Sequence, residues 1–297
     1  MTRPSNHRAK QNLVGYLFIS PWLIGFLFFT AWPFVRSIYL SFTRYDIVSE
    51  PKWVGAANYK MLVTNDPLFW QSAWVTIKYA SISVPLSIII GVLLALLLNA
   101  NVKGIALFRT FFYVPSIVPT VATSVLFIWI LNPNIGLVNR LLALVGIQGP
   151  SWLNTAPWAF YSFVLMSLWG VGGSMVIYLA GLKDIPAYLY EAATIDGASP
   201  FRKMRHITLP MMTPVIFFNL VMGIIGAFQY FTQAYVMTPN GGPQQSTYAY
   251  SLYLYNRAWT YLDMGYASAM AWILFVVIAV LTATVFRTQR RWVHYGG

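Results

Sequence analysis

Six long apolar stretches dominate this chain of 297 residues and limit its fold more than any other feature. They cover residues 13–35, 74–98, 110–131, 158–181, 211–237 and 265–286, and none of them contains Asp or Glu. A helix that crosses a bilayer needs about 20 mostly apolar residues, which each stretch supplies. Lys78 is the only basic residue inside a stretch, and it lies near an end, where its stem can reach the interface. The sequence therefore predicts an all-α polytopic membrane protein with six transmembrane helices.

The distribution of charge predicts how these helices are oriented. Only 9% of the residues are charged, too few to cover the surface of a soluble enzyme. If the N-terminus is cytoplasmic, 12 basic residues lie inside, 6 lie outside, and Lys78 lies within a span. The positive-inside rule then predicts an N-in/C-in topology, with cytoplasmic termini at 1–12 and 287–297 and a membrane domain at 13–286. We attribute the net charge of +12 to this orientation, and not to nucleic-acid binding.

The predicted cytoplasmic segment 182–210 contains start and stop signals for two short helices. Asp184 is expected to cap a first helix that has Pro186 in its first turn. Gly197 is expected to end that helix at the C′ position, where glycine adopts a positive φ without strain. Ser199 and Pro200 then begin a second helix over residues 201–208, which should end near Pro210. The segment is therefore predicted to form two helices with a sharp bend.

The same segment carries a motif of high specificity. Its residues follow the spacing E-A-A-x3-G-x9-I-x-L-P, which resembles the EAA motif of the membrane subunits of ATP-driven importers. The surrounding string 190–200, together with residues 241–243 and 263–268, is similar to the carbohydrate-uptake branch of ABC transporter permeases, of the maltose and glycerol-phosphate type. This resemblance implies that 182–210 is a cytoplasmic two-helix coupling loop. The residues it assigns to coupling with an ATPase are Glu191, Ala192, Ala193, Asp196, Gly197, Ile207, Leu209 and Pro210.

The resemblance also implies a function and partners. The chain would be the permease subunit of an importer that translocates a mono- or oligosaccharide through the cytoplasmic membrane of a bacterium or archaeon. Its implied partners are a second homologous permease subunit in a heterodimer, an ATPase dimer, membrane lipid and an extracytoplasmic sugar-binding protein. The dipeptide Gly-Lys of a Walker A loop does not occur here, so a partner is expected to bind and hydrolyse ATP with Mg²⁺. The chain is thus expected to be non-catalytic, with no cofactor or metal of its own.

A row of amides in the fifth stretch is the best candidate for the sugar path. Five positions of this stretch, three of them with side-chain amides, share one face about 80° wide if the helix is continuous. Amides are uncharged donors and acceptors, which suits a hydroxyl-rich neutral ligand, although they also bond between membrane helices. Gly170, in the fourth stretch, is a second candidate, for which close helix packing is the alternative. The positions in the fifth stretch are Asn219, Met222, Gly226, Gln229 and Gln233.

Two other classes of function remain as alternatives. An ion-coupled secondary transporter usually needs an ionisable residue at membrane depth, and the six stretches contain no Asp or Glu. An intramembrane enzyme would need a catalytic constellation such as paired acids, which is not found at that depth. The tyrosine-rich segment 247–261 is compatible with interfacial anchoring or with contact to a binding protein.

Overall fold

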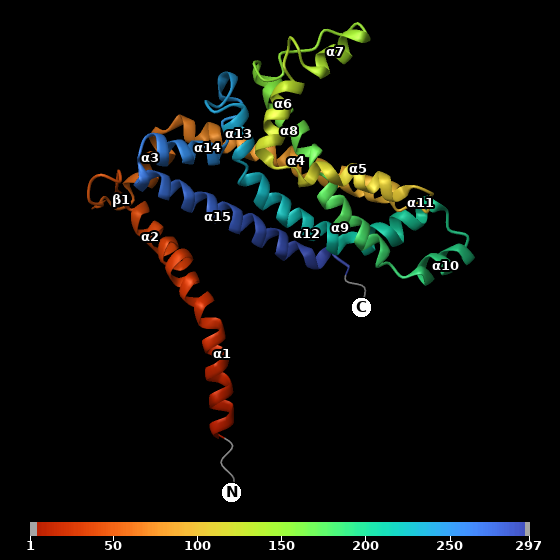
Figure 1. Ribbon diagram of the computed structural model, residues 1–297, viewed down its shortest axis with the longest axis horizontal. Helices are drawn as coiled ribbons and strands as arrows, with labels where there is room; N and C mark the ends of the chain where they lie inside the picture. The colour runs from red at the N-terminus through yellow and green to blue at the C-terminus, as the bar shows by residue number, and fades with distance from the viewer. Residues whose placement is uncertain (1–4, 295–297) are drawn as a thin grey trace. The chain divides into compact units, whose positions relative to one another are not determined.

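The computed structural model describes residues 5–294, so parts of both predicted termini, 1–4 and 295–297, lie outside the described residues (Figure 1). Within the described range the only strands are β1 (Thr43–Arg44) and β2 (Lys52–Trp53), an antiparallel pair in which Thr43 faces Trp53. The rest of the regular structure is helical, which confirms the predicted all-α class. The chain divides into two compact units, residues up to 65 with 255–273, and residues 66–254 with those from 274 onward.

The helices reproduce the apolar stretches, and two of them are sharply bent. Among the described residues, four helical runs are long and apolar enough to cross a membrane: 14–41, 67–98, 200–237 and 264–291. Two bent pairs raise the number to six if each pair is one span. The first pair is α5 (Ile105–Ile117) with α6 (Thr120–Ile130), bent by 100°. The second is α8 (Ala156–Trp169) with α9 (Gly172–Lys183), bent by 45°.

The sharp bend between α5 and α6 divides the predicted span 110–131 into two helices. Val118 has an extended backbone, with φ −72° and ψ 131°, because the proline ring that follows disfavours the helical region at this position. Pro119 is itself outside the helix, with ψ 137°, and α6 begins after it. The break therefore has a local cause in the dipeptide Val118-Pro119.

The first unit joins the N-terminal helix to a folded loop. Its elements are α1 (Ser5–Phe26), a π-helical turn (Leu27–Ala31), α2 (Trp32–Ser41), the two strands, α3 (Ala57–Asn65), a second π-helical turn (Asn256–Thr260) and the start of α15 (Met264–Thr288). Asn58 donates hydrogen bonds to the carbonyls of Ser41 and Thr43, at 2.8 and 2.9 Å. A Cβ on Gly265 would lie 2.0 Å from the Thr43 carbonyl oxygen, so only glycine permits the start of α15 to approach this loop.

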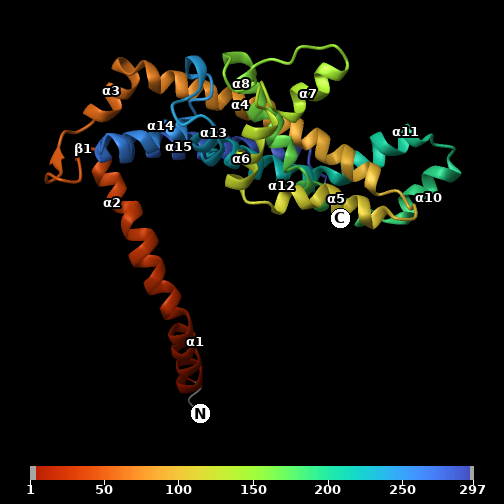
Figure 2. The same ribbon diagram turned by 45° about the horizontal axis from the view of Figure 1, so that its top comes forward.

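The second unit is organised around α4 (Pro67–Leu98). This helix packs along α8, α9 and α12 (Leu209–Phe228), which lie side by side with it in Figures 1 and 2. Asp66 caps its start by accepting the N–H of Phe69 at 3.2 Å. At its other end Arg109 donates two hydrogen bonds to the Leu98 carbonyl, at 3.1 and 2.8 Å. The remaining helices are α7 (Leu137–Leu144), α10 (Ala187–Ile195), α11 (Pro200–Lys203), a π-helical turn (Met204–Thr208), α13 (Thr232–Met237), α14 (Tyr250–Tyr255) and two 3₁₀ turns (Pro243–Gln245 and Gln289–Arg291).

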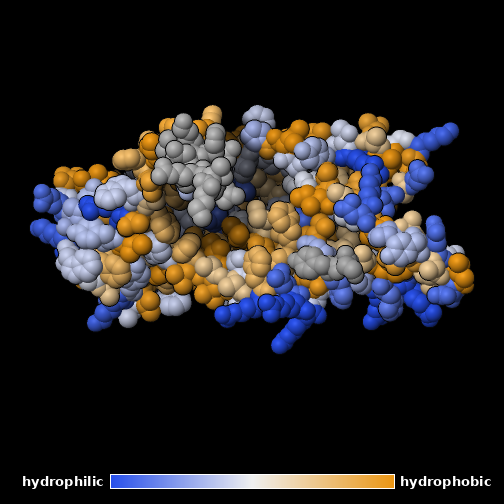
Figure 3. All heavy atoms as spheres, turned by 90° about the horizontal axis from the view of Figure 1, so that it is seen from below, coloured by the Kyte–Doolittle hydropathy of each residue, from blue (hydrophilic) through white to orange (hydrophobic). Residues whose placement is uncertain are grey.

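A buried apolar cluster lies where the C-terminal half of α4 meets α9. We call it the α4–α9 cluster, and it is packed on one side by residues of α10 and of the following helical run. Large apolar side chains are also exposed elsewhere, such as Phe29, which is 84% exposed. Figure 3 shows apolar side chains over much of the visible face, as expected for helices that contact lipid. The α4–α9 cluster consists of Val92, Ala95, Leu98, Met175, Tyr178, Leu179, Leu182, Ile185 and Met212.

Candidate functional site

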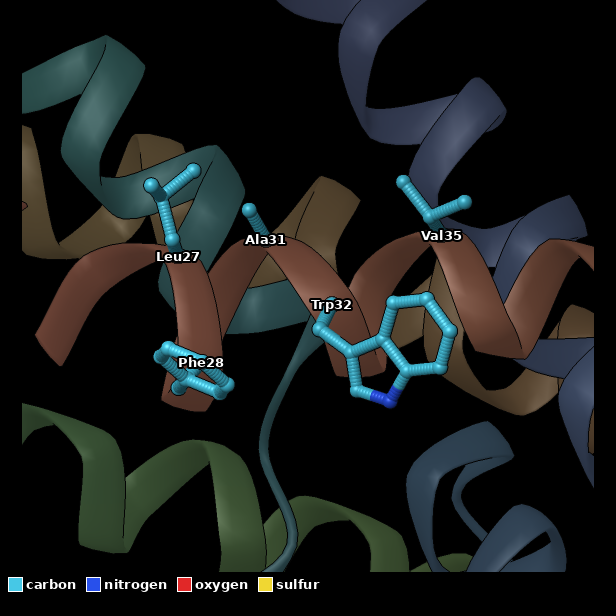
Figure 4. A pocket seen from close by; sticks show the side chains of 5 residues that line it. All are labelled: Leu27, Phe28, Ala31, Trp32 and Val35. Atoms are coloured by element: carbon cyan, nitrogen blue, oxygen red, sulfur yellow. The ribbon is translucent and has the colours of Figure 1, made fainter. Parts of the chain in front are cut away.

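Four hollows differ in their suitability for a hydroxyl-rich ligand. One, of about 560 Å³, is lined by five side chains of a single helical run, residues 27–35, all apolar or aromatic (Figure 4). A second, of about 710 Å³, lies in the second unit beside α5 and is also mostly apolar. A third, of about 360 Å³, is lined by residues of α4, α6, α8, α12 and α13, and its described lining is rich in hydroxyl and amide groups. A fourth hollow, of about 540 Å³ beside α7, is also partly polar, but its lining includes the charged Arg140. The third hollow, which we call the polar pocket, is the uncharged polar one among these four and best matches the chemistry of a neutral sugar.

The polar pocket combines three kinds of lining group, and none of its described lining residues is charged. Its two amides, Gln229 and Gln233, lie at the end of α12 and on α13. Gly223 and Gly226 on α12 leave room beside them. The hydroxyl groups are those of Tyr79, Ser83, Ser87, Thr120, Ser167, Tyr230 and Thr232.

Helical spacing on α4 explains part of this lining. Tyr79, Ser83 and Ser87 are four residues apart, so they share one face of the helix. The ring of Tyr79 lies 4.2 Å from that of Tyr230, measured between centroids, and Phe163 of α8 lies 6.3 Å from Tyr230. The aromatic contacts hold Tyr230 in a buried position at the pocket wall. The sequence analysis did not identify the three hydroxyl positions on α4, whose four-residue spacing shows only that they share a helix face.

The fifth apolar stretch is not the unbroken helix that the sequence predicts. α12 ends at Phe228, and Gln229 and Phe231 have non-helical backbone angles before α13 begins. Ser251 donates a hydrogen bond of 3.4 Å to the Phe228 carbonyl that this break frees. Irregular backbone at membrane depth is tolerated where it is buried in protein or lines a cavity, and here it lines the polar pocket.

The structure separates the residues that the sequence proposed for the sugar path. Gly226, Gln229 and Gln233 line the polar pocket. Asn219 does not line it, and its side-chain amide donates to the Val215 carbonyl of its own helix at 2.9 Å. Gly170 also lies outside it, at the end of α8. Which of these residues contact a sugar stays a prediction.

The break between α8 and α9 does not line the polar pocket, but it includes a close packing contact between helices. A Cβ on Gly172 would lie 2.0 Å from the Phe112 carbonyl oxygen, so α9 can approach α5 there only because this residue is glycine. Met222, one of the predicted amide-row positions, is half exposed and does not line the polar pocket. Gly172 thus acts in helix packing, whereas a Cβ on Gly170, the residue for which that alternative was raised, would meet nothing within 4 Å.

The predicted coupling loop has the expected bend. α10 ends in a Schellman motif, in which Ala198 N–H donates to the Ala193 carbonyl at 2.9 Å and Gly197 N–H donates to Thr194 at 3.1 Å. Gly197 has φ +72°, as predicted for the C′ position. α11 begins after Ser199, whose hydroxyl accepts the Arg202 N–H at 3.4 Å. Figures 1 and 2 show α10 and α11 as a hairpin at one end of the second unit.

The first of two corrections in this loop concerns the start of α10. Asp184 does not cap it, because α9 extends to Lys183 and Asp184 continues its helical turn with φ −78° and ψ −10°. Its N–H still donates to the Ala180 carbonyl at 3.2 Å. The N-cap position is Pro186, which makes no side-chain capping bond.

The second correction concerns the end of the second helix. This helix does not stop near Pro210, since residues 200–228 are helical without interruption, through the π-helical turn 204–208 and into α12. Leu209 N–H donates to the Met204 carbonyl, five residues earlier. The wider turn accommodates a proline that lacks a donor and would otherwise crowd the preceding turn.

The EAA residues divide into an exposed and a packed group. Glu191, Ala192, Asp196 and Gly197 are exposed, Ala193 is half-buried, and Ile195 beside them is 87% exposed. Ile207 and Leu209 pack against the α4–α9 cluster. Two hydrogen bonds brace the hairpin: Tyr190 with Thr208 at 2.9 Å, and the Lys203 ammonium to Thr194 at 2.7 Å. Within residues 5–294, no three His, Asp or Glu side chains gather as metal ligands would.

Comparison with known proteins identifies the family. The family model described as "Binding-protein-dependent transport system inner membrane component" matches residues 87–294, which include the polar pocket's α12–α13 wall and the whole hairpin. The chain belongs to this family. The probable ABC transporter permease protein YesP of Bacillus subtilis is 47% identical over 296 residues, covering 99% of this chain and 96% of that protein. The arabinooligosaccharides transport system permease protein AraP of Bacillus subtilis is 34% identical over 270 residues, covering 90% and 85%.

A solved structure shares the fold of this inner membrane component. A subunit of a bacterial alginate ABC transporter, in complex with an alginate pentasaccharide-bound periplasmic protein, superposes with a TM-score of 0.85 at 23% identity. The match covers 97% of this chain and 98% of that one. The resemblance to ABC transporter permeases that the EAA spacing indicated is therefore confirmed for the family and for the fold.

Proposed function

We propose that this chain is the permease subunit of an ATP-driven importer that moves a mono- or oligosaccharide across the cytoplasmic membrane. The observation that carries the proposal is the polar pocket, which is uncharged, rich in hydroxyl and amide groups, and placed at the end of the helical run that begins in the EAA hairpin. Hydroxyls and amides can each donate and accept, as a sugar does. The names of AraP and of the alginate transporter point to carbohydrate cargo in these similar proteins.

The lack of charge among the described lining residues favours neutral sugars over phosphorylated ones, which would need basic partners. The pocket volume of about 360 Å³ is at the small end of the range for ligand sites. An oligosaccharide would therefore occupy it with part of its length at a time. The carbohydrate would be delivered by an extracytoplasmic binding protein, as the alginate complex with its periplasmic protein suggests by analogy.

Coupling to ATP hydrolysis would act through the continuous helical run 200–228. An ATPase subunit that docks on the hairpin α10–α11 would move this run as one body, and its far end carries Gln229 at the polar pocket. The exposed side chains of Ile195 and Phe201 offer apolar contact area beside the small Ala192. A pair of ATPase subunits would supply the ATP and Mg²⁺ chemistry. A second permease subunit would complete the path.

Gln229→Leu tests the polar pocket. The substitution keeps the size of the side chain and removes its hydrogen bonds to a passing sugar. A hydrogen bond of this kind contributes about 0.5–1.5 kcal/mol, so we expect the KM for uptake to rise about 2- to 10-fold. Uptake of radiolabelled arabino- and malto-oligosaccharides is measured in proteoliposomes that contain the complete transporter and its binding protein, with the amount of inserted chain quantified in each preparation.

Asn219→Leu is the matched control, because it removes an amide from the same helix at a position outside the pocket. Its KM should stay within about twofold of the wild type, since its amide bonds to its own helix. Equal KM values for Gln229→Leu and the wild type would contradict the assignment of the polar pocket to the sugar. A wild-type transporter that imports none of the tested sugars but imports a charged solute would refute the carbohydrate proposal.

A further inference from the structure

The side chain of Tyr178 on α9 is buried in an unfavourable way. It is 0% exposed, inside the α4–α9 cluster. Among the described residues its phenol oxygen has no hydrogen-bond partner. A buried hydroxyl without a partner loses the hydrogen bonds that water would supply. Burial of the Tyr178 ring therefore stabilises this conformation, whereas burial of its hydroxyl destabilises it. Phenylalanine would fill the same space without this penalty.

The ring of Tyr178 marks the closest approach of α9 to α4. A Cβ on Gly91 would lie 2.8 Å from Cε2 and 3.1 Å from Cδ2 of this ring, and 3.2 Å from the hydroxyl of Ser174. The two helices reach this separation only because residue 91 is glycine. Any movement of α9 along α4 must therefore carry the Tyr178 ring across the surface of α4.

This contact lies between the two functional parts of the second unit. On one side, α4 continues through Ser87 and Ser83 into the wall of the polar pocket. On the other side, Leu189 and Tyr190 of α10 pack against the cluster that holds Tyr178. A displacement of the hairpin that reaches the pocket through α9 and α4 would therefore pass this tyrosine.

Ser87 supplies a hydroxyl on the facing helix, so its position relative to Tyr178 changes when α9 moves along α4. It lies one helical turn before Gly91 on the same face of α4. Side chains on a helix point toward its N-terminus, and α4 and α9 run in the same direction in the predicted topology. We therefore expect the phenol group to point along α4 toward Ser87. In this conformation the Ser87 hydroxyl donates to the Val84 carbonyl at 2.9 Å, which leaves its lone pairs available to accept. A shift smaller than one helical turn, about 5.4 Å, would join the two groups.

We propose that Tyr178 is a positioning residue of the transport cycle: its hydroxyl lacks a partner here and gains one, from Ser87, when α9 moves against α4. This inference rests on the proposed coupling of the hairpin to a separate ATPase. The hydroxyl raises the free energy of the present conformation and lowers that of the alternate one. It thereby keeps the two conformations close in energy, which a cyclic transporter needs in order to turn over.

Tyr178→Phe in the complete transporter tests this role. The variant should stabilise the present conformation, so the unfolding midpoint of the nucleotide-free complex should rise by about 1–2 °C. The maximal rates of uptake and of binding-protein-stimulated ATP hydrolysis should fall about 3- to 30-fold, because the shift in population equals the cost of the unpaired hydroxyl. The KM for sugar should change less than twofold, since Tyr178 does not line the polar pocket.

Two further variants make the result specific. Tyr190→Phe is the matched control beside the same cluster, and because its hydroxyl is paired with Thr208 at 2.9 Å, its loss should lower the unfolding midpoint. Ser87→Ala should lower the maximal rate, and adding it to Tyr178→Phe should lower the rate no further, as expected when two residues act through one bond.

The outcomes separate this inference from the proposed function. A wild-type complex whose ATPase ignores the loaded binding protein would refute the proposed coupling itself. A responsive wild type with an equally responsive Tyr178→Phe variant would overturn only the role of Tyr178. A lower unfolding midpoint for Tyr178→Phe would likewise overturn it, because that result would show that the hydroxyl is already satisfied.

Discussion

Gly197→Pro is expected to abolish ATP-driven uptake by the assembled transporter while leaving the chain in the membrane. Proline fixes φ near −65°, whereas Gly197 requires φ +72°. Proline also lacks the N–H that Gly197 donates to the Thr194 carbonyl at 3.1 Å. Both changes destroy the Schellman motif that sets the angle between α10 and α11. A displacement of about 1 Å in a positioned element can cost about 100-fold in rate, so we expect uptake to fall by at least about that factor.

Local packing does not complicate this result, because nothing lies within 4 Å of a Cβ placed on Gly197. Gly146→Pro is the matched control: Gly146 follows α7 in a second Schellman motif, has φ +77° and has equally open space around it. That variant should retain stimulated ATP hydrolysis. Gly197→Asn should retain part of the uptake, since asparagine tolerates a positive φ. Wild-type uptake by Gly197→Pro would show that the bend has no part in coupling. The measurements are uptake, stimulated ATP hydrolysis and the amount of inserted chain.

The features that were predicted from sequence have causes within a few residues. The bend at Gly197 follows from its own backbone freedom, and the start of α11 follows from a serine cap and a proline in the first turn. The apolar stretches depend only on composition over about 20 residues. Each of these features can be predicted from local sequence, without knowledge of which segments contact one another.

The features that were missed depend on neighbours distant in sequence or on compensation. Pro210 predicted a helix end, but a wider turn at 204–208 accommodates the ring and lets the helix continue. Gln229 and Gln233 were placed on one face of a continuous helix, yet both reach the polar pocket through a break between α12 and α13. Asn219, on the regular part of that helix, does not reach it.

The hydroxyl groups of the polar pocket illustrate the same limit. Serine in membrane helices commonly bonds to the preceding turn of its own helix, as Ser167 does to Val164 at 2.6 Å. Residue type therefore does not distinguish a pocket serine from a packing one. The pocket exists because α4, α6, α8, α12 and α13 converge, and a single sequence does not encode that convergence in any local pattern.

Gly226→Trp is expected to block uptake with little damage to the fold. Nothing lies within 4 Å of a Cβ placed on Gly226, so a larger side chain enters the open space of the polar pocket and displaces no neighbour. An indole is large in relation to a cavity of about 360 Å³. Overfilling a site costs about 1–3 kcal/mol, so we expect sugar uptake to fall by a factor of about 5 to 150. Uptake is measured in proteoliposomes, and thermal unfolding of the purified complex reports the fold.

Gly170→Trp provides the control at a glycine that the sequence also proposed for the path. Its Cβ position is equally open, with nothing within 4 Å, but it lies outside the polar pocket. We expect this variant to import sugar at close to the wild-type rate. Loss of uptake in Gly170→Trp with normal uptake in Gly226→Trp would move the path away from the polar pocket and toward the break between α8 and α9. The pair therefore decides between two routes, because the same bulk is added to equally open glycines and only the location differs.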